Sequence, residues 1–156
     1  MRTRPALAAV GALLAIVMGG ILGAGTSMAR PSEAPRVAVY GDIIWTAGGN
    51  HANCRGGIKV SLKTDPAHRG VVYATYTPLR FTGDGPNWKR RPVCTTRVWS
   101  NWGIQVPGHN WSPLIVTGPR GGKPVHKTLF TGSGVQAMGF GTAGAHHSIA
   151  DYLLVP

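Results

Sequence analysis

The stretch Ile58-Lys59-Val60-Ser61-Leu62-Lys63 alternates strictly between apolar and polar side chains. Successive side chains of a β-strand point to opposite faces, so this alternation predicts a strand with one dry face and one wet face. We expect Ile58, Val60 and Leu62 to point into a hydrophobic core. The polar residues between them are expected to face solvent.

Similar short runs, rich in Val, Ile, Thr and aromatic residues and bounded by Gly, Pro, Asn or Asp, recur along the chain, whereas helical periodicity is nearly absent. They predict an all-β, single-domain antiparallel sandwich or partly open barrel of seven to nine short strands. Besides Ile58 to Thr64, the expected strands are Val37 to Thr46, Val71 to Thr77, Val93 to Trp99, Trp102 to Val106, Leu114 to Thr117, Val125 to Thr131, Val135 to Phe140 and Tyr152 to Val155.

The two cysteines of the chain fall on expected inward positions. Cys94 shares its strand face with Val98, and Cys54 has the same parity as Ile58, although Gly56-Gly57 between them can break the phase. A single pair of cysteines in an exported chain predicts one disulfide, here between Cys54 and Cys94. The alternative is a pair of unlinked buried thiols.

The N-terminus has the organisation of an export signal. Two arginines within the first four residues precede the apolar stretch from Ala6 to Met18, and Ser27-Met28-Ala29 offers small residues for signal peptidase. We therefore predict a signal peptide over residues 1–29, in helical form, followed by a flexible leader over 30–36 and one β domain over 37–156. The protein is expected to be secreted; in the alternative, residues 1–29 stay uncleaved and tether it to a membrane.

Charge is the second bulk signal. Residues 30–156 hold 14 of the 16 Lys and Arg and all 5 acidic residues, which gives a formal net charge of +9. Such a balance favours an anionic polysaccharide or another acidic surface component as partner, and it leaves nucleic acid open. Contact with a membrane is expected only through an uncleaved signal segment. The simpler reading of the charge is solubility.

The positions of the tryptophans indicate a candidate binding region. Four of the five lie between residues 88 and 111, beside several cations. Aromatic faces next to cations suit stacking on sugars or bases together with pairing to acidic groups. The expected ligand-binding residues are Trp88, Lys89, Arg90, Arg91, Arg97, Trp99 and Trp111. In the alternative, Trp99 and Trp102 belong to the core and residues 89–91 form a solvated loop.

Catalytic and metal motifs are weak. His146, His147 and Asp151 form the densest group of potential metal ligands, but adjacent histidines on a strand face opposite ways, and no His-Glu-x-x-His or Cys-x-x-Cys spacing occurs. We expect no metal and no cofactor. The sequence favours a small, basic, secreted, non-catalytic protein that binds an anionic or carbohydrate surface component. The alternatives are a secreted hydrolase whose site is assembled by folding, and a structural or interaction domain without a small ligand.

Overall fold

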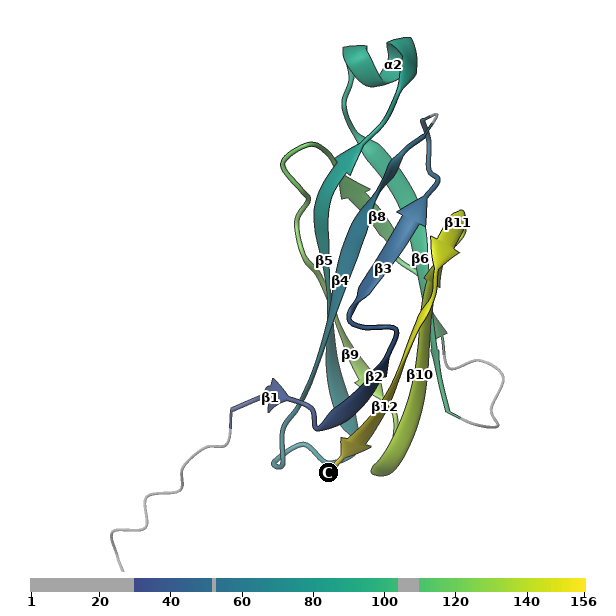
Figure 1. The fold of residues 1–156 in the computed structure, drawn as a ribbon. Helices are drawn as coiled ribbons and strands as arrows, with labels where there is room; N and C mark the ends of the chain where they lie inside the picture. Colours follow the sequence, from purple (N-terminus) through teal and green to yellow (C-terminus); the bar gives the residue numbers. More distant parts are fainter. Residues whose placement is uncertain (1–29, 52, 104–109) are drawn as a thin grey trace, which may run out of the picture.

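The computed structural model describes residues 30–51, 53–103 and 110–156, and these form a sandwich of two antiparallel sheets (Figure 1). Sheet A runs in the order β11 (Ala145–His147), β3 (Ile43–Ala47), β4 (Arg55–Thr64), β5 (Val71–Thr82) and β9 (Val125–Phe130), with β1 (Ser32–Glu33) also on β4. Sheet B runs in the order β2 (Arg36–Val39), β12 (Ile149–Val155), β10 (Gly134–Thr142), β6 (Cys94–Trp102) and β7 (Asn110–Trp111), with β8 (Leu114–Thr117) also on β6. The predicted all-β sandwich is confirmed.

The alternating segment from Ile58 to Lys63 belongs to β4, which lies between β3 and β5 in the middle of sheet A. Ile58, Val60 and Leu62 are fully buried, whereas Lys59 and Lys63 are exposed, as the sequence predicts. Immediately upstream, the register with β5 shifts between Gly56 and Ile58. This irregularity lies at the glycine pair and resets the phase of the strand before the regular alternation begins.

The disulfide between Cys54 and Cys94 is confirmed. Both cysteines are fully buried, and their Cα atoms lie 6.0 Å apart. Cys54 directly precedes β4 of sheet A and Cys94 begins β6 of sheet B, so the bond ties the two sheets together. On the chain-entropy model, closing a loop of this length stabilises the fold by about 4 kcal/mol.

The described ranges contain 12 strands, more than the seven to nine expected, partly because the chain changes sheets within predicted strands. The run Val37 to Thr46 is divided into β2 in sheet B and β3 in sheet A. Tyr40 and Gly41 have φ angles of +67° and +81° and turn the chain between the layers. Positive φ at a tyrosine is uncommon, so the sequence pattern did not reveal this break.

Other strand boundaries differ from the predicted ones because a strand continues beyond the residue at which it was expected to end. β5 continues through Pro78 to Thr82, at the register irregularity opposite the glycine pair. β6 continues to Trp102, so the two strands expected at Val93 to Trp99 and Trp102 to Val106 begin as one; residues 104–109 lie outside the described residues. The short strands β1, β7 and β11 were not predicted.

The segment expected as a flexible leader is part of the sandwich. Ser32 and Glu33 pair with the end of β4, Ala34 is buried and donates its N–H to Leu62 O at 2.9 Å, and Arg36 begins β2. The prolines do not prevent this docking because Pro35 offers its carbonyl, which accepts from the N–H of Leu154.

The loop at 83–92 holds the one helix among the described residues, α2 (Gly85–Arg90), at one tip of the sandwich (Figure 1). Pro86 stands in its first turn, where a missing N–H costs nothing. Within the described ranges no helix is long and apolar enough to cross a bilayer. The predicted signal helix over 1–29 lies outside the described residues.

Candidate functional site

The seven residues of the predicted binding region lie in three different places. Trp111 on β7 packs against the core: its ring stacks on that of Tyr76, with centroids 4.7 Å apart and planes 8° apart. Tyr76 is fully buried, and this burial raises the pKa of its phenol far above the usual value. Trp111 is therefore a packing residue at the place where β5 of sheet A meets β7 of sheet B.

The residues from Trp88 to Arg91 lie on and just after α2. Trp88 is half-buried, covers Gly83, and meets the ring of His51 edge-on at 6.1 Å. Lys89, Arg90 and Arg91 are exposed, and the Arg90 guanidinium donates to the side chain of Asn87 on its own helix. This tip is a cationic surface, and Trp88 packs it against Gly83 and His51.

Arg97 and Trp99 lie on the outer face of sheet B, the side that the alternation along β6 predicts for both. The Trp99 indole covers Gly141, where an added Cβ would lie 2.3 Å from a ring carbon, and its Nε1 donates to Thr142 O at 3.2 Å. Arg97 donates to Ser112 O at 3.0 Å. Arg97 and Trp99 are thus held by contacts with the protein's own backbone. Ligand binding by the seven residues together stays a prediction.

A different tryptophan, Trp45, stands on the outer face of sheet A. Its neighbours Ile44 and Thr46 are buried, so the strand alternation directs Trp45 outward, where 54% of its surface is exposed. In register, Trp45 lies between Gly57 on β4 and His147 on β11. We call Tyr40, Trp45, Lys59 and His147 the Trp45 face.

Gly57 fixes how the indole lies. A Cβ at this position would come within 2.9 Å of Ile43 Cγ2 and 3.1 Å of Trp45 Cζ3, so the indole reaches over the bare backbone of β4. The absent side chain lets the aromatic ring cover the strand, and Trp45 still remains more than half exposed. A ring held in this way can stack on a ligand with little loss of side-chain entropy.

Two further rings extend the surface beside Trp45. Tyr40, which is 72% exposed at the turn between the sheets, meets the ring of His147 edge-on at 5.2 Å and 77°. β11 lies beside β3 (Figure 1), and the two strands flank a shallow pocket of about 570 Å³. The pocket is lined by Trp45, Thr46, Ala47, Arg55, Gly56, Ala145, His146 and His147.

The charges near this face are cationic. Lys59 is the next outward residue of β4 after Gly57 and lies opposite Ile43; it has no ion-pair partner among the described residues. Arg55 lies 3.2 Å from Asp84. A hydrogen bond from Asn53, and then the contact with Arg55, lower the pKa of Asp84 below its usual value. The charge of Arg55 is therefore balanced by Asp84, whereas that of Lys59 is not balanced by a contacting acid within the described residues.

Two pairs of polar side chains could take part in proton transfer. His68 Nδ1 lies 3.0 Å from Asp65 Oδ2, within a turn where Asp65 also accepts from the N–H of Ala67. Thr75 Oγ1 lies 3.0 Å from His126 Nδ1 across the outer face of sheet A. A nucleophile requires a base and a group that orients it. Neither pair has a third partner of this kind within the described ranges.

The histidines and acid weighed as metal ligands are separated in the structure. His146 meets Trp99 edge-on, His147 meets Tyr40, and Asp151 is fully buried beside Arg36. In the part of the chain that the structure describes, no group of three His, Cys, Asp or Glu side chains is placed to hold a metal ion.

Sequence reasoning missed Trp45. The run Ile43-Ile44-Trp45 is apolar throughout, so the sequence has no alternation here that marks Trp45 as outward-facing. Its outward direction follows from the pairing of β3 with β4 and β11, which no local pattern predicts. No protein-family model, curated protein or solved structure matches this chain.

Proposed function

We propose that this protein is an exported, non-catalytic binding protein whose ligand is an anionic polysaccharide, held on the Trp45 face. The observation that carries the proposal is the half-exposed Trp45 indole, laid over Gly57 with the unpaired Lys59 ammonium on the same side of β4. The apolar face of a sugar ring can stack on the indole, and an acidic substituent of the sugar can pair with the lysine.

The bulk charge supports the same partner. A net charge of +9 on residues 30–156 attracts a polyanion and speeds its association. The shallow pocket beside Trp45 provides room for a sugar substituent without enclosing it, as binding along an extended chain requires.

Export is supported by the buried Cys54–Cys94 disulfide, because structural disulfides persist in oxidising compartments and are rare in the cytosol of mesophiles. The charged start and the apolar stretch within residues 1–29 predict a signal peptide, which is consistent with export. Mass spectrometry of the protein recovered from the producing cells gives its N-terminus: a start near Arg30 supports secretion, whereas an intact Met1 or an N-terminus near it supports a tether.

The proposal is tested by retention of the exported protein on polyuronate, heparin and polynucleotide resins across a salt gradient. We expect retention on the acidic polysaccharides that weakens as salt rises. Binding releases counterions from the polymer, and this release is less favourable at high salt concentration. Lys59→Ala should elute at lower salt than Arg69→Ala, a matched loss of one exposed cation in the turn after Asp65. Elution of the two variants together would remove Lys59 from the site.

The resins also separate the alternative ligand. Retention on polynucleotide alone, with no affinity for either polysaccharide, would contradict the proposal and favour a nucleic-acid partner. Elution at very low salt from all three resins would show that the positive charge has no role in binding.

A further inference from the structure

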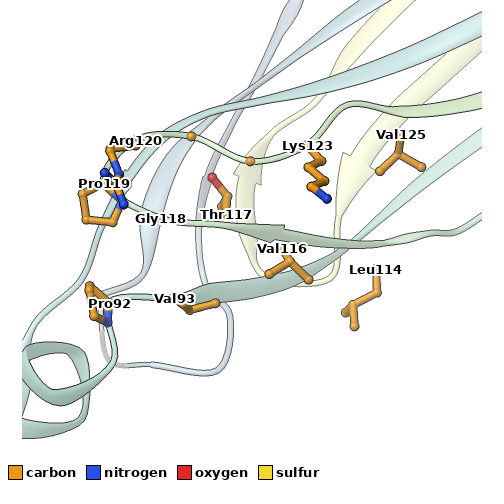
Figure 2. A pocket seen from close by; sticks show the side chains of 12 residues that line it. Pro92, Val93, Leu114, Val116, Thr117, Gly118, Pro119, Arg120, Lys123 and Val125 are labelled. Atoms are coloured by element: carbon orange, nitrogen blue, oxygen red, sulfur yellow. The ribbon is translucent and has the colours of Figure 1, made fainter.

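A second cavity lies between β8 of sheet B and the linker over residues 118–124 that leads to β9 of sheet A. Figure 2 shows Leu114 and Val116 on the strand side and Lys123 on the linker side, with Pro92 and Val93 toward one end. The groove has a volume of about 690 Å³, within the range of small-molecule sites. Its lining is Pro92, Val93, Leu114, Val116, Thr117, Gly118, Pro119, Arg120, Gly121, Gly122, Lys123 and Val125.

The floor of this groove is aliphatic. Leu114 and Val116 alternate with the buried Ile115 and Thr117, so both point away from the core, and about half of each side chain is exposed. Val93 and Val125 add further apolar surface. Exposed aliphatic side chains within a concave site are typical of a surface that binds an apolar group.

The linker covers the edge of β8 that does not pair with β6, so another strand cannot pair there. A Cβ at Gly122 would lie 2.2 Å from Val116 O, and the Gly122 N–H donates to Pro78 O at 3.2 Å. The linker backbone is therefore packed against β8 at the point where an added peptide strand would form its hydrogen bonds. This argues against recognition of a peptide by strand addition and favours a ligand without a backbone ladder.

The charges at the groove are of one sign. Arg120 and Lys123 are its two charged lining residues, and no acidic side chain contributes to the described lining. Neither cation has an ion-pair partner in the part of the chain that the structure describes. In Figure 2 the Lys123 side chain points from the linker toward β8, and Arg120 lies beside Pro119 at the end near Pro92.

We propose that this groove binds the monomeric anion of a long-chain carboxylic acid. The alkyl chain lies over Val116 and Leu114, and the carboxylate pairs with Lys123 or Arg120. An aliphatic floor, cations without acidic neighbours, and a strand edge covered by the linker together fit a narrow amphiphilic anion. This inference does not depend on the Trp45 face, since the groove and that face share no residue.

The test measures binding of dodecanoate, below its micelle concentration, to the exported protein by titration calorimetry, with dodecanol and butanoate as probes that lack the charge or the chain. We expect dodecanoate to bind at one site and butanoate not to bind. The double variant Arg120→Ala, Lys123→Ala should weaken dodecanoate at least about tenfold, equivalent to about 1.4 kcal/mol. Dodecanol should bind this variant and the unmodified protein equally.

Leu114→Ser tests the floor, with Val135→Ser as its matched control. Val135 is 70% exposed on β10, outside this groove. Leu114→Ser should weaken both twelve-carbon probes, and Val135→Ser should leave them unchanged, with near-ultraviolet circular dichroism confirming that each variant is folded. Absent dodecanoate binding, equal effects of the two serine variants, or displacement of dodecanoate by an acidic peptide as effectively as by tetradecanoate would overturn the proposal.

Discussion

The outer faces of the two sheets are built by the same alternation yet present different chemistry. On sheet A, outward positions of β3 and β4 carry Trp45 and Lys59. On sheet B, β2, β12 and β10 bring together aliphatic and phenolic side chains, of which Val37 pairs in register with Tyr152, and Val135 with Leu154. Each of these four side chains is more than half exposed.

This contrast shows that alternation decides which way a side chain points but not what it does there. Tyr152 and Trp45 are exposed to nearly the same extent, 51% and 54%, yet Tyr152 has aliphatic neighbours and Trp45 lies over a glycine beside cations. Trp99 and Trp111, from the tryptophan-dense region, therefore cover the protein's own backbone and rings, whereas the isolated Trp45 holds the position suited to a ligand.

The largest expected effect comes from separating the two sheets. The double variant Cys54→Ala, Cys94→Ala removes the covalent tie between sheets A and B and should lower the free energy of unfolding by about 2–5 kcal/mol. Urea unfolding measures the loss. Reductant should destabilise the unmodified protein and leave the variant unaffected; equal sensitivity of the two proteins would contradict this role of the disulfide.

The two glycines of β4 have different roles: Gly56 packs against the core, and Gly57 positions the Trp45 indole. A Cβ at Gly56 would lie 2.2 Å from the Phe81 ring and 2.6 Å from Arg80 O, so Gly56→Ala should destabilise the protein by about 1–3 kcal/mol. Gly57→Ala meets only side chains and should cost less stability, but it should displace the indole and weaken polysaccharide binding. Thermal unfolding and polyuronate affinity measure both variants, and a reversed order of stabilities would refute the comparison.

A third effect contrasts two neighbours on β12, the buried Asp151 and the outward Tyr152. Burial raises the pKa of Asp151, against the opposing effect of Arg36 at 3.1 Å, and its Oδ2 has no hydrogen-bond partner in the described structure. Because its pKa is higher in the folded than in the unfolded protein, ionised Asp151 costs stability above its folded pKa, and this cost disappears as the pH falls toward 4.

Asp151→Asn should therefore be less harmful, or more favourable, to stability at pH 7 than at pH 4. Urea unfolding at the two pH values gives the difference directly, with Tyr152→Phe as a control that has no titrating carboxyl. A destabilisation by Asp151→Asn that is larger at pH 7 than at pH 4 would show that the sign is wrong.

The smallest expected effect comes from the apolar patch on sheet B. Val135→Ser and Leu154→Ser alter exposed side chains, so each should change the free energy of unfolding by no more than about 0.5 kcal/mol. Both should reduce binding of a hydrophobic dye and leave polysaccharide affinity unchanged. A loss of polysaccharide affinity in either variant would mean that the ligand contacts both faces.

Much of the fold was predictable because its strongest signals are local. The alternation from Ile58 to Lys63 and the parities of Cys54 and Cys94 depend only on the period of a strand. The turn at Tyr40 was not predictable, because its positive φ belongs to a residue type that rarely adopts it. Local pattern therefore predicted the sheets but not the point at which the chain passes between them.

The site was harder to predict because it depends on pairing between distant segments. Trp111 stacks on Tyr76, which lies on the other sheet, and the Trp45 indole is positioned by Gly57 and His147 from two other strands. No local pattern reports which residues become cross-strand neighbours. Ligand binding by the region from Trp88 to Trp111 accordingly stays a prediction, and the Trp45 face emerges only from the register.

The central claim is tested most directly by the equilibrium affinity of Trp45→Ala for a soluble polyuronate, compared with Tyr152→Ala. Each variant removes one half-exposed aromatic ring from one outer face. We expect Trp45→Ala to bind about fivefold to tenfold more weakly than the unmodified protein, equivalent to about 1–1.4 kcal/mol of lost stacking, and Tyr152→Ala to bind normally. Equal affinities for the two variants would contradict the account.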